Sequence, residues 1–241
     1  MFDRLIDHAA LFPPASMELD EALTEDRAAR SSQHAELLNR FVVPAARVSE
    51  LPDEMPPLSA VLPDAAGAAQ LEGDDRVRAV ELRLEGARPR PADLLAAYRS
   101  LEPLDVTTYF ELVFDDGWRD AVPAAIGAVA AVGGRVKVRC GGEHVPSVDQ
   151  LALVVACCRE AGVRFKATAG LHHAVRRGDE HGFLNLMAAV TAPREGIAAV
   201  LAEEDAASLD VRPESRELFD GFGSCSWREP IDDLRELGML P

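Results

Sequence analysis

The stretch "VELRLE", residues 80–85, decides how the chain folds. In a β-strand, side chains at i and i+2 share a face, so this stretch places its apolar residues on one face and its charged residues on the other. The same division recurs in "YFELVF" at 109–114, "VKVRC" at 136–140 and "FKAT" at 165–168. Parallel strands that are buried on both faces normally consist of continuous apolar runs. The charged faces of these four strands therefore need an enclosed place where charges can meet.

Short β-type runs alternate with helical stretches along most of the chain, which is typical of a parallel sheet covered by helices. The predicted strands are 41–48, 59–63, 77–85, 107–114, 135–140 and 164–168. Helices are expected at "PADLLAAYRSL" (91–101), "WRDAVPAAIGAVAAVG" (118–133) and "SVDQLALVVACCREAG" (147–162), the last with a Ser cap and a Gly stop.

The remaining segments complete a closed barrel in this interpretation. Residues 181–192 fit a strand or a helix, 194–209 are expected to be helical, and "LFDGFGSCSW" (218–227) is expected to be the closing strand. The composition shows no break along the 241 residues. We therefore predict a single (β/α)8 TIM-type barrel domain over 1–241, with seven or eight parallel strands. An extra N-terminal helix at 19–39 is expected to precede the first strand.

If the apolar faces meet the helices, the opposite faces point into the barrel. The residues expected there are Glu81, Arg83, Glu111, Lys137, Arg139, Lys166 and Thr168. An unpaired buried charge costs several kcal/mol, so these groups must pair with one another or with a ligand. One alternative is that they form mutually neutralising ion pairs, and another is a functional cluster at the C-terminal mouth, where active sites of such barrels lie.

The functional alternative predicts catalysis on a small anionic carbonyl compound, with a carboxylate or phosphate group. Neighbouring cations lower the pKa of a buried lysine, and a neutral amine can form a Schiff base with a carbonyl. Lys166 is expected to act as the nucleophile or base, with Lys137 beside it on the preceding strand. Glu81 or Glu111 is expected to move protons. Lys137 also belongs, with Arg139 and Arg83, to the expected anion-binding group.

The loops that follow these strands supply further candidates. Gly141 and Gly142 let the chain turn and offer backbone N–H groups to an anion. Thr168 offers a hydroxyl group at the end of its strand. His172 and His173 are expected to handle protons near neutral pH, one of them in a functional role and the other in a structural one.

Other candidates have an equally simple structural explanation. His181 and Asn185 lie one helical turn apart, and either bind substrate or cap a helix. Ser224 and Ser226 end the closing strand, where barrels often bind phosphate, although a tight turn explains them as well. The loop "LIDHAALFPPAS", residues 5–16, is a lid or a plug, and its Asp7 and His8 reach the site only if it folds over the mouth.

Composition excludes several classes of function. The 41 acidic and 25 basic residues give a net charge of −16, which repels nucleic acids and anionic membranes. No apolar run spans a bilayer and no signal peptide is present, so a cytoplasmic location is expected. The spacing of four cysteines fits neither disulfides nor a zinc site. Nucleotide-binding glycine motifs are absent. The oligomeric state, a homo-oligomer included, stays open.

Two resemblances accompany this interpretation. The first is carried by "LFPPAS" (11–16), "RFVVPAARVSEL" (40–51), "KVRCGG" (137–142), "FKATAGLHHAVR" (165–176), "HGFLNLMAA" (181–189) and "FGSCSWREPIDDL" (222–234). These segments resemble a functionally uncharacterised bacterial protein family, which implies no reaction.

The second resemblance is local. "KATAG" at 166–170 is similar to the K-T-S-T-G motif of the deoxyribose-phosphate aldolase group, whose sixth strand carries the Schiff-base lysine. This resemblance implies a Schiff base at Lys166 and aldolase-like lyase chemistry without a cofactor. The group has a second reactive lysine on the following strand, whereas here the other lysine, Lys137, lies on the preceding one.

Two further functions remain open at this point. One is a metal-dependent lyase, isomerase or hydrolase, in which Glu81, Glu111 and a histidine hold a divalent metal in the same mouth. The other is a non-catalytic barrel that binds a metabolite or a protein partner through its acidic exterior.

Overall fold

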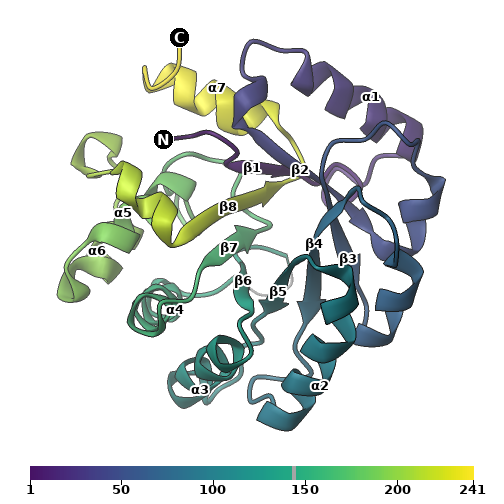
Figure 1. Ribbon diagram of the computed structural model, residues 1–241. Coiled ribbons are helices and arrows are strands. Elements are labelled where there is room, and N and C mark those ends of the chain that lie inside the picture. Colours follow the sequence, from purple (N-terminus) through teal and green to yellow (C-terminus); the bar gives the residue numbers. More distant parts are fainter. Residues whose placement is uncertain (143–144) are drawn as a thin grey trace.

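Eight parallel strands form a closed barrel in the computed structural model, which describes residues 1–142 and 145–241 (Figure 1). The strands pair in sequence order, and β1 pairs with both β2 and β8, which closes the ring. They are β1 Ile6–His8, β2 Leu38–Pro44, β3 Leu58–Leu62, β4 Val77–Arg83, β5 Thr107–Glu111, β6 Arg135–Arg139, β7 Phe165–Thr168 and β8 Phe219–Ser224. The predicted (β/α)8 fold class is confirmed.

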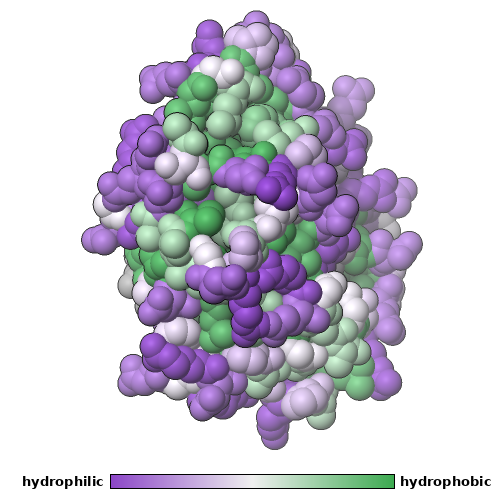
Figure 2. All heavy atoms as spheres, turned by 90° about the vertical axis from the view of Figure 1, so that its left-hand side faces the viewer, coloured by the Kyte–Doolittle hydropathy of each residue, from purple (hydrophilic) through white to green (hydrophobic). Residues whose placement is uncertain are grey.

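Helices surround this barrel on the outside (Figure 1). They are α1 Leu19–Arg30, α2 Pro91–Leu101, α3 Trp118–Ala131, α4 Val148–Ala161, α5 Phe183–Thr191, α6 Ile197–Ala202 and α7 Arg228–Glu236. The two connections between β2 and β4 use short 3-10 helices instead, Ala45–Glu50 and Ala65–Leu71. Hydrophobic residues on the face shown in Figure 2 are broken up by hydrophilic side chains.

The apolar faces of the strands pack against the helices and form the main core. Phe110, Val136 and Phe165 are fully buried in it. The ring of Phe222 on β8 stacks on Phe183 of α5 with the ring centroids 4.6 Å apart. Because even positions of β4, β5 and β6 face the helices, the odd positions point into the barrel, as the alternation in the sequence predicts.

The first strand and the order of the later ones differ from the prediction. The chain begins its barrel with β1, so α1 is the ordinary connection between β1 and β2 and not an extra N-terminal helix. Three residues are too short for a periodic signal, and all three are buried. As a result, Phe165–Thr168 is the seventh strand and not the sixth.

The ambiguous segment after β7 is helical. Helix α5 has no polar face, because every residue from Phe183 to Val190 is buried. A helix that is buried all round loses the amphipathic pattern by which helices are recognised. The helix predicted at 194–209 is mostly shorter turns, with α6 covering only Ile197–Ala202.

Candidate active site

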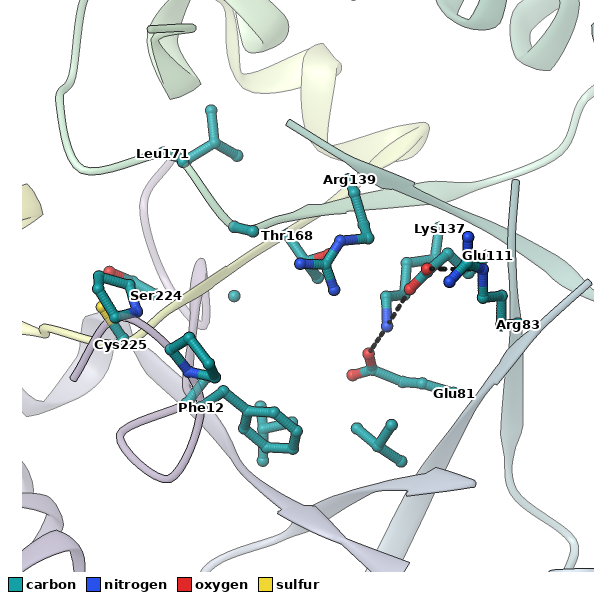
Figure 3. Close-up of a pocket in the computed structure, with 18 of the residues that line it drawn as sticks. Phe12, Glu81, Arg83, Glu111, Lys137, Arg139, Thr168, Leu171, Ser224 and Cys225 are labelled. Carbon is teal, nitrogen blue, oxygen red and sulfur yellow. Dashed lines mark ion pairs between the residues drawn. The ribbon is translucent and has the colours of Figure 1, made fainter. Parts of the chain in front are cut away.

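A cavity of about 260 Å³ opens at the C-terminal ends of the strands. Its charged wall consists of Glu81, Arg83, Glu111, Lys137 and Arg139. Figure 3 shows these side chains together on one side, with Phe12, Ser224 and Cys225 across the cavity from them. The loop that carries Phe12, Pro13 and Pro14 lines the same cavity, so the segment after β1 does reach the mouth.

Two lysines and three carboxylates form a continuous chain of ion pairs inside the barrel. The Lys166 Nζ lies 2.5 Å from an oxygen of Asp7 and 2.7 Å from Glu81. The Lys137 Nζ lies 2.7 Å from the other oxygen of Glu81 and 2.8 Å from Glu111. The alternation predicted that these charges would pair with one another or with a ligand, and they pair with one another.

Glu81 is the centre of this chain. Its carboxylate binds both lysines and also accepts a hydrogen bond of 2.7 Å from the Ser59 hydroxyl. Burial alone raises the pKa of Glu81, but the ammonium groups of Lys137 and Lys166 lower it well below its ordinary value of 4.5. The Glu81 carboxylate therefore stays ionised throughout the neutral range.

Lys166 lies beneath the cavity instead of lining it. Its side chain is 1% exposed, and its Nζ lies 5.3 Å from the centroid of the Tyr109 ring. Burial lowers the pKa of its ammonium group, but Asp7 and Glu81 raise it above the ordinary value of 10.5. The expectation that neighbouring cations lower the pKa of Lys166 is therefore wrong, because the nearest charges are carboxylates.

Lys137, in contrast, forms part of the cavity wall. It occupies the middle of β6, directly beside Glu111 of β5 and Lys166 of β7 in the strand register. Figure 3 shows its amino group between Glu81 and Glu111. A ligand in the cavity meets this amine with a proton acceptor on either side.

The mouth of the barrel carries two arginines in different surroundings. The Arg83 side chain is 70% exposed and its Nε lies 3.9 Å from Glu111. Arg139 also lines the cavity, and with the residues that the structure describes it makes no ion pair. Thr168 lies opposite Arg139 in the register of β6 and β7, and its buried Oγ1 has no hydrogen-bond partner among the described residues.

The two glycines predicted to hold an anion serve the packing of the loops. A Cβ on Gly141 would lie 2.7 Å from the Cα of Gly170, so the loops after β6 and β7 touch at their backbones. Gly142 has a φ of +91°, a conformation that favours glycine. Both line a second hollow beside Arg139 and not the main cavity.

The histidines lie in three different environments. His172 lines the cavity, and its Nδ1 lies 2.9 Å from Glu229 at the start of α7. His173 lies 3.4 Å from both Glu180 and Asp233, away from the cavity. His172 therefore lies at the mouth and His173 outside it, and a functional role for His172 stays a prediction.

His181 and Asn185 make backbone contacts that organise the loop after β7. The His181 Nε2 lies 2.7 Å from the Pro146 carbonyl, and burial lowers the pKa of this imidazole. The Asn185 side chain donates to the carbonyls of Val200 and Glu203. Neither residue lines the cavity, so substrate binding by them has no geometric support.

The end of β8 also differs from the predicted phosphate site. Ser224 lines the cavity, but its hydroxyl donates a 2.6 Å hydrogen bond to the Ser226 carbonyl. The Ser226 hydroxyl accepts from the Glu229 N–H at the start of α7. These contacts match the alternative of a tight turn before the last helix.

Tyr109 and Asp220 were not among the predicted site residues, and Asp7 was expected to reach the site only if its loop folds over the mouth. Asp7 binds Lys166, and below them Asp220 accepts from the Tyr109 hydroxyl at 2.8 Å and from Arg135 at 2.8 Å. Burial raises the pKa of Tyr109 well above its ordinary value. Tyr109 lies on the charged face of "YFELVF", so the alternation of that strand could have identified it as an inward-facing residue. Strand β1 has three residues, which are too few to show in which direction Asp7 points.

The described residues do not gather a metal-binding group. Among them, no three histidine, cysteine, aspartate or glutamate side chains are placed to hold a metal ion. Glu81 and Glu111, the oxygen ligands of the metal-dependent alternative, both bind Lys137 instead. In the same part of the chain, no helix has both the length and the apolar composition needed to cross a membrane.

Comparison with known proteins adds a likeness in fold. No family model matches the chain, and no curated protein is significantly similar to it, so membership of the uncharacterised bacterial family stays a prediction. Among solved structures, the chain is similar to a tetrameric deoxyribose phosphate aldolase from Aeropyrum pernix. The two share 13% identity with a TM-score of 0.63, over 98% of this chain and 92% of that chain. The chain therefore has a TIM barrel that is structurally similar to the barrel of an aldolase.

Proposed function

We propose that this protein is an aldolase-like lyase that binds a small carbonyl compound as a Schiff base on Lys137. The observation that carries the proposal is a lysine amine on the cavity wall, flanked by Glu81 and Glu111, with a second lysine fixed behind it. The structural similarity to an aldolase agrees with this chemistry.

The composition of the chain supports a chemical role for these amines. The 241 residues contain only two lysines, Lys137 and Lys166. The other 23 of the 25 lysine and arginine residues are arginines. Both lysines lie inside the barrel. Arginine keeps its proton under all ordinary conditions and cannot form a Schiff base, so a primary amine is chemically distinct at these positions.

Lys137 is a better nucleophile than Lys166 in this geometry. Both amines contact two carboxylates, but a ligand in the cavity reaches Lys137 directly, whereas Lys166 lies beneath the cavity with its side chain 1% exposed. We therefore assign the nucleophile to Lys137 and give Lys166 a positioning role. A permanent positive charge at Lys166 holds Glu81 in place and balances part of its negative charge.

The order of the strands also favours Lys137. In the aldolase group that the sequence resembles, the Schiff-base lysine lies on the sixth strand and the second lysine on the strand after it. With β1 counted, Lys137 is on the sixth strand and Lys166 on the seventh. The local match of "KATAG" to the family motif is thus offset by one strand, while the pair of lysines follows the family order.

The reaction begins with a proton transfer from the Lys137 ammonium to Glu111. The neutral Nζ attacks the carbonyl carbon, and a proton moves from nitrogen to the former carbonyl oxygen. Glu111 then returns its proton, the hydroxyl leaves as water, and a positively charged iminium remains on Lys137. Overall, an ammonium and a carbonyl become an iminium and water, so the net charge of the site is unchanged.

Carbon–carbon cleavage then uses the iminium as an electron sink. A carboxylate accepts the proton of a hydroxyl group on the carbon β to the iminium carbon, and the bond between the α and β carbons breaks. Its electron pair forms an enamine, and the β carbon leaves as an aldehyde. Protonation of the enamine and hydrolysis of the resulting iminium release the second product.

Borohydride trapping tests this proposal directly. The protein is incubated with a panel of small aldehydes, ketones and 2-oxo acids, reduced with borohydride, and weighed intact. Because the chain has two lysines, an adduct can form at Lys137, at Lys166 or at the N-terminal amine. Peptide mapping is expected to place it at Lys137, and Lys137→Arg is expected to remove it. An adduct confined to the N-terminus would refute the proposal.

The positioning role of Lys166 needs a separate variant. Lys166→Met is expected to slow adduct formation at Lys137 and to shift its pH profile, because Glu81 loses one of its two counter-charges. Lys166→Arg keeps the charge and is expected to restore part of the rate. An unchanged pH profile in Lys166→Met would refute this role.

Metal analysis of protein purified without chelator tests the metal-dependent alternative.

A further inference from the structure

We propose that the substrate of this site is a 4-hydroxy-2-oxo acid whose remaining substituent is apolar and whose carboxylate binds Arg139 and Thr168. This inference rests on the Schiff-base function proposed above and narrows it to one class of carbonyl compound. It selects a carboxylate over a phosphate as the anionic group.

Arg139 and Thr168 place two hydrogen-bond donors side by side at the cavity wall. The two residues are register partners on β6 and β7, and both line the cavity. The Thr168 Oγ1 is buried without a hydrogen-bond partner among the described residues, an arrangement that costs free energy unless a ligand completes it. A guanidinium and a hydroxyl group together suit a planar carboxylate.

The charge of the wall fits a monoanion. Among the described residues that line the cavity, the cations are Arg83, Lys137 and Arg139 and the carboxylates are Glu81 and Glu111. This leaves one net positive charge. A phosphate monoester carries about −1.5 to −2 at neutral pH, whereas a carboxylate carries a single negative charge. The wall therefore balances a carboxylate and leaves a phosphate partly uncompensated.

The loops after β7 and β8, where barrels often bind phosphate, differ here from such a site. Such sites use the loops after the seventh and eighth strands. At the end of β8 the Ser224 hydroxyl already donates to the Ser226 carbonyl, and the described cavity residues from 169 to 171 and 223 to 225 include no cation. Of the two arginines that line the cavity, Arg139 on β6 is the one nearer in sequence to Lys137.

The spacing of Lys137 and Arg139 places the carboxylate next to the carbonyl. Residues at i and i+2 of a strand point to the same side and lie roughly 6–7 Å apart along it. Lys137 and Arg139 are such a pair on β6, and both side chains reach the cavity. A substrate that bonds to the amine and pairs with the guanidinium then needs its carboxylate close to the carbonyl carbon. A carboxylate on that carbon itself, as in a 2-oxo acid, meets this requirement.

The rest of the substrate faces an apolar surface. Phe12 lies across the cavity from the charged wall (Figure 3), and Pro13 and Pro14 of the same loop also line the cavity. Val42, Val61 and Leu62 on β2 and β3 add apolar lining on the side next to Glu81, the register partner of Val61. Apolar area buried against these side chains contributes roughly 25 cal/mol per Å² to binding. This surface selects a hydrocarbon substituent over a polyhydroxylated one.

Equilibrium binding of ligands without a carbonyl tests the carboxylate subsite independently of Schiff-base formation. The probes are isobutyrate, inorganic phosphate and glycerol phosphate, measured by calorimetry on the full chain. Isobutyrate is expected to bind more tightly than either phosphate. Arg139→Gln is expected to weaken isobutyrate at least tenfold and Thr168→Val several-fold, whereas Arg83→Gln, at the arginine that faces Glu111, changes it less. Tighter binding of the phosphates, or equal affinity in Arg139→Gln, would overturn the inference.

Trapping with matched carbonyl compounds separates this inference from the proposed function. A branched 2-oxo acid and the corresponding aldehyde without the carboxylate are each reduced with borohydride in wild type and Arg139→Gln. Preference for the 2-oxo acid that disappears in Arg139→Gln supports the inference. Equal trapping of both compounds overturns it and leaves the Schiff base intact. Absence of any adduct with Arg139-dependent isobutyrate binding overturns the Schiff base and supports the carboxylate subsite.

Discussion

Lys166 holds its positive charge on a side chain that is almost fully buried. Taking an ammonium group and two carboxylates out of water costs several kcal/mol for each ion, and their mutual attraction only offsets this cost when the geometry is close. The contacts of Lys166 with Asp7 and Glu81 provide that geometry. Replacing buried ion pairs by apolar side chains of similar volume is often neutral or stabilising, so the presence of these charges agrees with the proposed role of the site.

The pH dependence of stability is expected to follow Glu81. Its pKa is lowered in the folded protein, so its contribution is complete above the ordinary value of 4.5 and is lost as the pH falls below it. Glu81→Gln is expected to be less stable at neutral pH and to show a smaller further loss of stability on acidification. Urea unfolding between pH 3 and 7 measures both effects.

Asp210 provides a matched control for this experiment. Hydrogen bonding to Arg212 lowers the pKa of Asp210 as well, but this carboxylate is fully exposed to solvent. Solvent and salt screen exposed ion pairs, so Asp210→Asn is expected to leave the loss of stability at low pH almost unchanged. If stability falls equally steeply with decreasing pH in Glu81→Gln and in the wild type, the assignment to Glu81 is contradicted.

The sequence predicts which residues face inward but not which of them pair. Alternation alone places Glu81, Lys137 and Lys166 on inward faces, because the side-chain period of a strand is two. Pairing depends on which strands are neighbours and how they are staggered. Asp7 could not be assigned to Lys166 without knowing that β1 lies close enough to β7, across β8, for their side chains to meet.

At the scale of elements, the loops after β6 and β7 hold the mouth in shape by a close backbone contact. A Cβ on Gly170 would lie 2.6 Å from the Cys140 carbonyl oxygen and 2.8 Å from the Cα of Gly141. Gly170 also has a φ of +64°. Any side chain at this position pushes the two loops apart, and these loops follow directly on Arg139 and Thr168.

Gly170→Ala is expected to destabilise the protein more than Gly162→Ala. Gly162 ends α4 with a φ of +65°, nearly the same as that of Gly170, but a Cβ there meets nothing within 4 Å. Both variants carry the cost of about 1–2 kcal/mol for a left-handed residue with a Cβ. Gly170→Ala adds roughly 1–3 kcal/mol of overpacking. Urea unfolding of the two variants measures the difference, and equal losses would contradict the close contact.

The helices differ in how well the sequence predicts them. Helix α4 was bounded correctly because Ser147 and Gln150 form a capping box and Gly162 adopts a left-handed conformation at its end. Helix α5 could not be assigned, since it is buried on all sides. These two helices show that sequence periodicity reports contrast between faces and fails where both faces are buried.

At the scale of the whole molecule, the net charge of −16 opposes the compact state. Salt screens repulsion between exposed charges over about 10 Å at 0.1 M, but acts much less on buried pairs. The midpoint of urea unfolding is therefore expected to rise between about 0.02 M and about 0.5 M sodium chloride. The stability difference between wild type and Lys166→Met serves as the control, because it is expected to stay constant. A midpoint that falls with salt would contradict this prediction.

Strand β1 has a consequence for how activity arises during folding. It is only three residues long, yet it joins β2 to β8 and supplies the carboxylate that anchors Lys166. Closure of the barrel and assembly of the chain of ion pairs are thus a single event. A partly folded chain whose first strand has detached would keep most of its secondary structure but lose the carboxylate that anchors Lys166. Under the proposed Schiff-base function, adduct formation at Lys137 is therefore expected to slow before the helical signal is lost on gradual denaturation.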